Sequence, residues 1–209
     1  ACGGRNFEYY SEDPYLSGAL AASLVRGIQS QNVGACPKHV CVNNQEYKRM
    51  RINVLVDERT LREVYLRGFE IVVKQASPYS LMTAYNQLNG EFCSEHERLW
   101  NDIIRKEWGH KGVVLTDWGA TNDRVRAVQA GVDLEMPGSS GAFDEQVEEA
   151  IKSGKLSESA LNDCVTRNVC LSLLGQDMVA QSQGVTADLD KHHELARKAA
   201  MESAVLLKN

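Results

Sequence analysis

Two kinds of hydrophobic pattern alternate along this chain, and together they predict its secondary structure. The clearest amphipathic helix spans residues 58–74, where apolar side chains recur at the 3.6-residue spacing of one helix face. Asp57 precedes this stretch and is a good N-cap residue. The face contains Leu61, Val64, Tyr65, Phe69 and Val72.

Further helices follow from the same pattern and from start signals. Residues 18–30 have helical periodicity, and Ser94-Glu95-His96-Glu97 has the form of a capping box at the start of a helix. That helix is expected to bury Trp100, Ile103, Ile104 and Trp108. Asp144 is the predicted cap of a helix over about 144–152. Ser157 can cap another, which carries Leu161, Cys164 and Val165.

Short apolar runs between the helices predict four strands, at about 33–41, 80–86, 112–117 and 132–136. Strand and helix therefore alternate about four times, which favours parallel βα units and an α/β fold. Four such units are half of an eight-fold (β/α)8 barrel. A doubly wound sheet is the alternative fold, but the chain has no G-x-G-x-x-G or Walker loop.

The pattern changes after Gly175, and this change divides the predicted domains. Residues 1–175 are interpreted as a partial (β/α) barrel. Residues 176–191 are polar and lack periodicity, so they are predicted to be a linker. Helical periodicity resumes over 192–209, interpreted as the start of a second domain. Because the sequence opens with Ala1-Cys2 rather than Met, we expect it to be a piece of a longer polypeptide.

Composition narrows the classes of protein that remain. Hydrophobic residues make up 43% of the 209 positions and the formal net charge is -5, without a basic run. Nucleic acid and membrane surfaces are therefore not expected partners. The six cysteines form no C-x-x-C pair and no Asn-x-Ser/Thr sequon is present. We therefore expect buried thiols, no metal or other cofactor, and a cytoplasmic location, although a secretion signal upstream would change the last point.

Barrel enzymes carry their reactive groups at the carboxyl ends of the strands, and this rule selects a small set of polar residues. Each member also has a structural interpretation, as a helix cap, a solvated charge or a hydrogen-bonded core residue. Together they would suit a ligand rich in hydroxyl groups. The set is Lys38, His39, Tyr85, Asn86, Asp117 and Glu135.

A series of motifs in fixed order gives these residues a family context. Gly4-Arg5-Asn6-Phe7-Glu8, Lys38-His39 with Arg49, Ala84-Tyr85-Asn86, Thr116-Asp117-Trp118 and the segment 130–138 each resemble signatures of glycoside hydrolase family 3. Ser203 to Asn209 resembles the start of the family's second domain, an α/β sandwich. The matches span nearly the whole chain, so it looks like part of a β-glucosidase.

The resemblance implies a role for each matching residue. Asp117 would be the catalytic nucleophile that forms a covalent glycosyl-enzyme with net retention. Substrate contacts are implied for the remaining positions, with Tyr85 donating to the carboxylate of Asp117 and Trp118 forming an aromatic wall. These positions are Arg5, Lys38, His39, Arg49, Tyr85 and Trp118.

The resemblance also leaves alternatives open. In the family the acid/base Glu lies in the second domain, beyond Asn209, so we expect the chain alone to be inactive and to need the remainder of its polypeptide. The segment after Lys38-His39 departs from the pattern of the branch that acts on N-acetylglucosaminides. A β-xylosidase, another β-glycosidase and a catalytically incomplete carbohydrate-binding fragment remain alternatives to a β-glucosidase.

Overall fold

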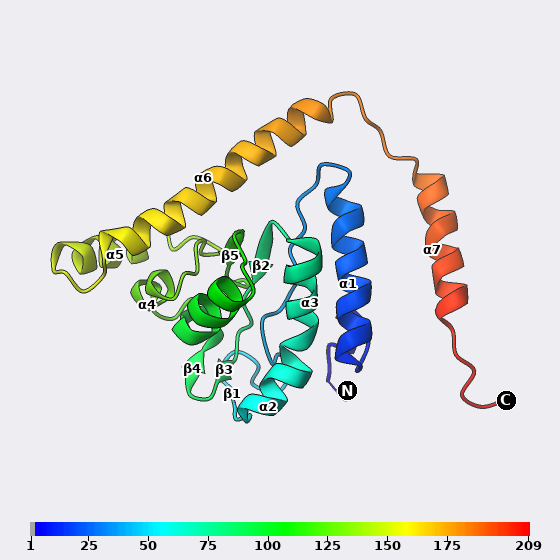
Figure 1. The fold of residues 1–209 in the computed structure, drawn as a ribbon, viewed down its shortest axis with the longest axis horizontal. Coiled ribbons are helices and arrows are strands. Elements are labelled where there is room, and N and C mark those ends of the chain that lie inside the picture. The colour runs from blue at the N-terminus through cyan, green and yellow to red at the C-terminus, as the bar shows by residue number, and fades with distance from the viewer. Residues whose placement is uncertain (1–2) are drawn as a thin grey trace.

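A computed structural model describes residues 3–209, so Ala1 and Cys2 lie outside the described part of the chain. Helices dominate, and short strands lie between them (Figure 1). In chain order the elements are η1 (Asn6–Glu8), α1 (Pro14–Gln29), β1 (Asn53–Val54), α2 (Glu58–Thr60), η2 (Leu61–Tyr65), α3 (Arg67–Ala76), β2 (Ser80–Met82), β3 (Gln87–Leu88), β4 (Glu91–Phe92), η3 (Cys93–Glu95), η4 (Arg98–Glu107), β5 (Val113–Leu115), α4 (Arg124–Gln129), α5 (Ala142–Lys152), α6 (Glu158–Gln181) and α7 (Leu189–Ser203).

Extended segments run parallel to one another at the centre of the molecule, and they lie side by side in the order in which they occur along the chain. β2 pairs with β5 in parallel, with Met82 opposite Leu115. On one side of β2, Val40 donates its backbone N–H to Met82 O at 2.8 Å. On the far side of β5, Leu115 and Leu134 form a parallel bridge. Two of the four predicted strands are confirmed, as β2 and β5. The segments predicted as strands at 33–41 and 132–136 each make only an isolated parallel bridge, to Thr83 and Leu115 respectively.

A second sheet, of three short strands, was not predicted. Its strand order is β1-β3-β4, with β1 and β3 parallel and β3 and β4 antiparallel. Asn89 and Gly90 join β3 to β4, and both have positive φ, 50° and 100°. An Asn-Gly pair suits this turn because both central residues of a type I′ hairpin need positive φ.

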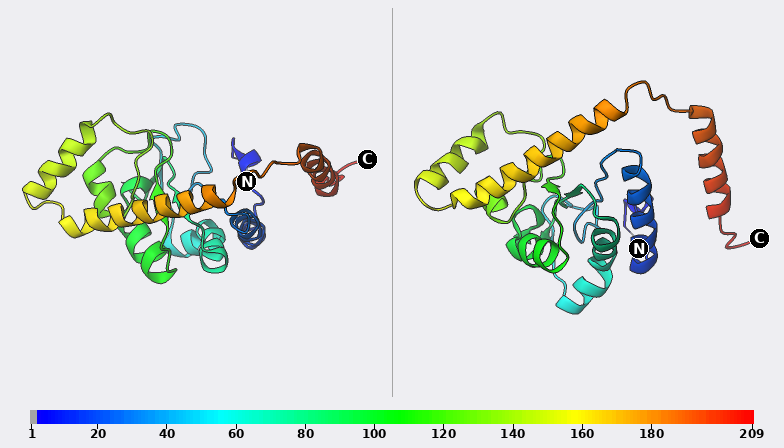
Figure 2. Two further views of the ribbon diagram at one scale, coloured as in Figure 1. Left: turned by 90° about the horizontal axis from the view of Figure 1, so that it is seen from above. Right: turned by 45° about the horizontal axis from the view of Figure 1, so that its top comes forward.

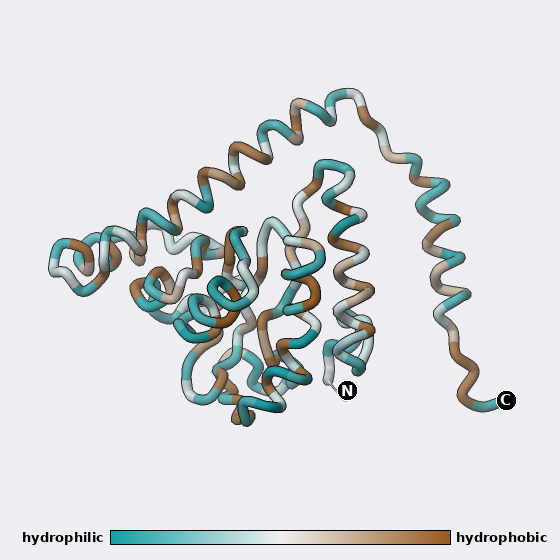
Figure 3. The backbone as a smooth tube through the Cα atoms, in the orientation of Figure 1, coloured by the Kyte–Doolittle hydropathy of each residue, from teal (hydrophilic) through white to brown (hydrophobic). Residues whose placement is uncertain are grey.

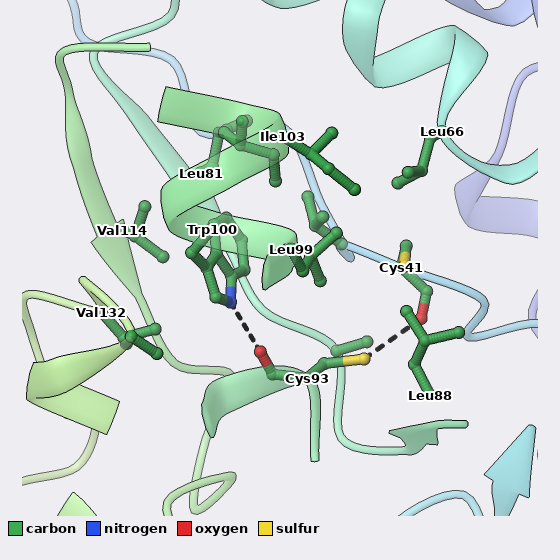
Figure 4. Packing of buried hydrophobic residues seen from close by; sticks show 14 of the residues in the cluster. Cys41, Leu66, Leu81, Leu88, Cys93, Leu99, Trp100, Ile103, Val114 and Val132 are labelled. Atoms are coloured by element: carbon green, nitrogen blue, oxygen red, sulfur yellow. Dashed lines mark hydrogen bonds between the residues drawn. The ribbon is translucent and has the colours of Figure 1, made fainter. Parts of the chain in front are cut away.

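The main hydrophobic core lies between the parallel segments and the helices η2 and η4. Trp100 from η4 is fully buried, and its indole N–H donates to the carbonyl of Cys93 at 2.6 Å (Figure 4). Cys41, Cys93 and Cys164 are buried free thiols, which confirms the expectation that several cysteines act as small core residues. A buried aromatic side chain of this size contributes a large part of the hydrophobic free energy that stabilises a core.

Two predicted helix caps are confirmed. Asp57 accepts the backbone N–H of Thr60 at 3.0 Å, and Ser157 accepts that of Ala160 at 3.1 Å. The helix predicted over 58–74 is a continuous helical run through α2, η2 and α3, with a wider π-turn in its middle. Each cap satisfies one of the backbone donors that the first turn of a helix leaves unpaired.

Two other predicted caps are wrong. The hydroxyl of Ser94 donates to the carbonyl of Ala120 at 2.9 Å, because Ser94 lies in the buried turn η3. His96 takes its place, since its Nδ1 accepts the backbone N–H of Leu99 at 3.2 Å. Asp144 lies in the first turn of α5, which begins after Gly141. An acidic side chain in a first turn still complements the helix dipole, which explains the misplaced prediction.

The predicted start of the linker at residue 176 is also wrong. α6 passes through Gly175 and ends at Gln181, because Gln176 and its successors are helix-compatible even without an apolar face. The side chain of Asn32 donates to Gln181 Oε1 at 2.8 Å near the end of this helix. The irregular connection is therefore confined to 182–188, and α7 already begins at Leu189.

The first half of α6 packs against α4 and β5, whereas α7 lies apart from the compact part of the chain (Figure 2). α7 has no buried residue, and the tail after it exposes Val205, Leu206 and Leu207. Apolar and polar positions alternate along both helices (Figure 3). Exposed apolar side chains on this scale are typical of surfaces that contact other protein segments.

Candidate functional site

Asp117 and His39 meet at the carboxyl ends of two of the parallel segments. Asp117 lies two residues beyond the end of β5, and its Oδ2 is 3.3 Å from His39 Nε2. Its other oxygen accepts the backbone N–H of Trp118 at 2.7 Å. The side chain of His39 is 2% exposed and that of Asp117 is 16% exposed, so a ligand can reach the carboxylate. Strand pairing therefore places a partly accessible carboxylate where parallel α/β folds bind ligands.

Tyr85 lies beside this carboxylate, beyond the end of β2. We predicted that its hydroxyl donates to Asp117; in the structure it donates to the backbone carbonyl of Trp118 at 2.8 Å and also lies within hydrogen-bonding reach of the Asp117 carboxylate. Burial and the nearby negative charge of Asp117 raise the pKa of Tyr85, so the phenol stays protonated at neutral pH. Arg49 stacks on the ring, with its Cζ 5.0 Å from the ring centroid.

Glu8 links the two predicted cations nearest to the N-terminus. One carboxylate oxygen pairs with Arg5 Nε, and the other accepts from Lys38 Nζ at 2.7 Å. Hydrogen bonds from Arg5 and Lys38 lower the pKa of Glu8 to about 2. Sequence reasoning missed this residue, although it closes the motif that begins at Gly4. Its carboxylate fixes both cations through charge-assisted hydrogen bonds.

Tyr9 is a second residue that sequence reasoning missed. Its hydroxyl lies 2.9 Å from His39 Nδ1, so both ring nitrogens of His39 have a partner. Burial lowers the pKa of His39, while the negative charge of Asp117 opposes that effect. Burial has the larger effect, so the imidazole is neutral at neutral pH. Two tyrosines in a row, Tyr9 and Tyr10, gave no signal of which one points inward.

The remaining predicted residues lie at the rim. Trp118 is 63% exposed, as an aromatic surface available to a ligand must be. Arg49 Nε is 3.6 Å from Glu46 Oε1, and this pair is partly open to solvent. The structure thus brings Asp117, His39, Tyr85 and Arg49 together. Arg5 and Lys38 are connected to this group through Glu8 and Tyr9, which adjoin each other in the chain.

A cavity of about 620 Å³ adjoins the site without containing all of it. Arg5, Lys38 and His39 line one part together with polar side chains such as Glu8 and Asn43, and apolar side chains of α1 and α3 line another part. Asp117 is not among the lining residues within the described chain. The carboxylate geometry is therefore a better guide to the site than this cavity, because Asp117 does not line the cavity.

Asp133 has a structural role. Its fully buried carboxylate accepts from Arg105 Nη2 at 2.9 Å, Arg167 Nε at 2.8 Å and the backbone N–H of Val114 at 2.7 Å. It therefore ties η4 and α6 to β5. Glu135 is more accessible, and burial raises its pKa although Arg124 opposes the shift. Neither carboxylate contacts Asp117 through a described interaction.

Two classes of feature are absent from residues 3–209. No group of three or more histidine, cysteine or acidic side chains is arranged to hold a metal ion. None of the described helices combines the length and the apolar character that crossing a bilayer requires.

Comparison with known proteins gives this arrangement a family. A model described as the glycosyl hydrolase family 3 N terminal domain matches residues 1–171. Thermostable beta-glucosidase B of Acetivibrio thermocellus is 55% identical over 206 residues, covering 99% of this chain and 27% of that protein. An exo-alpha-(1->6)-L-arabinopyranosidase of Bifidobacterium breve is 42% identical, with 99% and 27% covered.

Solved structures agree with the sequence comparisons. Beta-glucosidase 3B from Thermotoga neapolitana in complex with alpha-D-glucose matches with a TM-score of 0.93 and 47% identity, covering 99% of this chain and 30% of that one. Fold and site together define a helix-rich α/β segment of a carbohydrate-cleaving enzyme family. The chain belongs to glycoside hydrolase family 3, as its motifs predicted. It spans about a quarter of the length of its curated relatives.

Proposed function

We propose that this chain carries the nucleophile half of a retaining, exo-acting β-glycosidase that removes terminal β-D-glucosyl residues. The position of Asp117 carries the proposal: a partly accessible carboxylate at a parallel strand end, with a neutral histidine at 3.3 Å. The β-glucosidase names of several relatives support glucose as the sugar. Net charge and motifs offer no support for nucleic acid as a partner.

Asp117 would attack the anomeric carbon while the bond to the leaving oxygen breaks. A covalent glycosyl-enzyme results, and the leaving oxygen takes a proton from a general acid. Water then attacks the same carbon, gives its proton to that acid/base and releases Asp117. Two displacements give net retention. The acid/base would come from the remainder of the polypeptide, since neither Glu135 nor Asp133 faces the nucleophile.

The other residues would bind and orient the sugar. Lys38 would donate to hydroxyls at the nucleophile, His39 would line the same subsite with its N–H toward Asp117, and Arg5 and Arg49 would add positive charge around it. Trp118 would cover the apolar face of a sugar ring. Neutral His39 and fixed Lys38 are preorganised, which favours the transition state over the free substrate. No cofactor is needed for this chemistry.

The wider architecture is part of the same proposal. The four parallel segments would be half of a (β/α)8 barrel, with the missing strands supplied upstream. The chain from about 192 onward would begin the α/β sandwich domain, with α7 as its first helix. The exposed apolar residues of α7 and the tail support a further domain that covers them. Free cysteines among the described residues support a reducing compartment, and we propose a cytoplasmic location for the enzyme.

The test uses the complete enzyme that contains this chain and a panel of nitrophenyl glycosides. We expect the highest kcat/KM with β-D-glucopyranoside and an initial product that is the β-anomer by proton NMR. Preference for β-D-xylopyranoside or for α-L-arabinopyranoside would change the assigned sugar; the latter is included because of the Bifidobacterium relative. An initial α-anomer from a β-glucoside, or no cleavage of any glycoside, would contradict the proposal.

A further inference from the structure

A line of polar side chains in close contact connects three separate parts of the chain. The hydroxyl of Tyr9 lies 2.9 Å from His39 Nδ1, and His39 Nε2 lies 3.3 Å from Asp117 Oδ2. Tyr9 comes directly after η1, His39 lies at the end of the first parallel segment, and Asp117 follows β5. The imidazole is therefore held from both sides, by a phenol and by a carboxylate.

Only one neutral tautomer of His39 satisfies this geometry. If Nδ1 carried the proton, the lone pair of Nε2 would face the carboxylate of Asp117, and the two would repel. If Nε2 carries it, its N–H faces the Asp117 carboxylate at 3.3 Å, an attractive contact, and Nδ1 accepts from the Tyr9 hydroxyl. The hydrogen bond at one ring nitrogen thereby determines the tautomer at the other.

The charges around the pair support the donor role of Tyr9. Burial and the negative charge of Glu8 raise the pKa of Tyr9 to about 12, so the phenol keeps its proton at neutral pH. Asp117, Lys38, Glu8 and Arg5 are the charged groups that face His39, and burial outweighs them in lowering its pKa. A neutral phenol therefore meets a neutral imidazole.

We propose that Tyr9 is a positioning residue that fixes His39 in the Nε2–H tautomer and so holds the Asp117 carboxylate in its orientation for attack. The inference rests on the proposed function of Asp117 as nucleophile. Tyr9 does not contact Asp117 in the described structure and acts through His39. The adjacent Tyr10 is 52% exposed and serves as a matched control.

A double-mutant cycle in the complete enzyme tests the coupling. Tyr9→Phe should lower kcat/KM about tenfold, the scale of one buried hydrogen bond, and should affect kcat more than KM. In a His39→Gln background the amide nitrogen is always a donor and has no tautomer to fix. There, Tyr9→Phe should change kcat/KM less than about twofold. Tyr10→Phe should match the wild type in both kcat/KM and thermal midpoint.

Equal losses in both backgrounds would overturn the proposal, and so would an unchanged Tyr9→Phe enzyme. A spectroscopic measurement decides the matter even if a variant folds poorly or no glycoside is cleaved. In protein labelled with 13C-histidine, the Cδ2 resonance of His39 is assigned by its loss in His39→Gln. We expect the shift of the Nε2–H tautomer at neutral pH. An Nδ1–H tautomer would overturn the inference, whereas absent glycoside cleavage alone would overturn only the proposed function.

Discussion

Lys38 Nζ lies 2.7 Å from the carboxylate of Glu8, a residue thirty positions earlier in the chain. The same carboxylate pairs with Arg5, so one acidic side chain orients two cations of the proposed sugar site. This arrangement differs from a set of independent surface lysines and arginines. Charge-assisted hydrogen bonds of this kind hold long side chains in one place before the ligand arrives.

Glu8→Gln should weaken sugar binding because both cations lose their charged partner. We expect kcat/KM to fall by about 10- to 100-fold, equivalent to about 1.5–3 kcal/mol for hydrogen bonds to charged groups. We expect Lys38→Ala to lower kcat/KM by a similar factor. The measurement is steady-state kinetics with a nitrophenyl β-glucoside in the complete enzyme.

Glu63→Gln is the matched control for Glu8→Gln. Glu63 also pairs with an arginine, Arg59, but both side chains are largely exposed, at 62% and 83%. Exposed pairs contribute little, so we expect activity and stability close to the wild type. If Glu8→Gln lowers only the thermal midpoint and leaves kcat/KM unchanged, Glu8 stabilises the fold and does not serve the site.

Periodicity and strand-end logic predicted much of this molecule. The continuous apolar run before Asp117 indicated a strand, and the rule that reactive groups follow parallel strands placed Lys38, His39 and Tyr85 at the same edge. Motif order supplied the family. These signals can be read from the sequence because each depends only on neighbouring residues or on the order of motifs along the chain.

The sequence did not reveal which of several similar neighbouring residues makes a given contact. Ser94 and Asp144 both have cap-forming side chains, but burial of one and a preceding glycine at the other shifted the caps. Glu8 and Tyr9 gain their roles only from contacts with residues about thirty positions away. α6 extended past Gly175 because helix propensity is enough without an apolar face.

Asp133→Asn should destabilise the fold rather than alter substrate recognition. The variant would leave Arg105 and Arg167 buried without a counter-charge, which costs about 3–5 kcal/mol. Thermal or chemical unfolding measures the effect, and KM at a permissive temperature should stay unchanged. Asp102→Asn is the control, because its ion pair with Lys106 is exposed. A raised KM with unchanged stability would instead implicate Asp133 in binding.

His110 should make stability depend on pH. Burial, with the positive charges of Arg105 and Arg167, lowers its pKa to about 3, and its Nε2 has no partner among the described residues. Between about pH 6.5 and pH 3 the unfolded chain binds a proton that the folded chain does not. The contribution of His110 to the free energy of unfolding is therefore fully present above pH 6.5, and it is lost as the pH falls toward 3.

The expected slope is about 1.4 kcal/mol per pH unit within that window. His110→Gln should remove this contribution, so its unfolding free energy should vary less between pH 6 and pH 4 than that of the wild type. Denaturant unfolding at a series of pH values provides the comparison. Parallel curves for the two proteins would show that His110 titrates normally in the folded state.

A polypeptide of residues 1–209 alone should show no measurable turnover of a nitrophenyl β-glucoside. The retaining mechanism needs an acid to protonate the leaving oxygen and then a base to activate water. Asp117 has no such second carboxylate facing it within the described chain. Activity close to that of the complete enzyme would mean that a carboxylate here, such as Glu135 or Glu46, fulfils this role.

Covalent trapping tests the central claim, that Asp117 is the nucleophile, most directly. The complete enzyme is incubated with a 2-deoxy-2-fluoro-β-glucoside that bears a good leaving group, then digested and analysed by mass spectrometry. We predict a single fluoroglucosyl adduct on the peptide that contains Thr116-Asp117-Trp118. Asp117→Asn should form no adduct and should lose several orders of magnitude in kcat. An adduct on a different carboxylate would contradict the account.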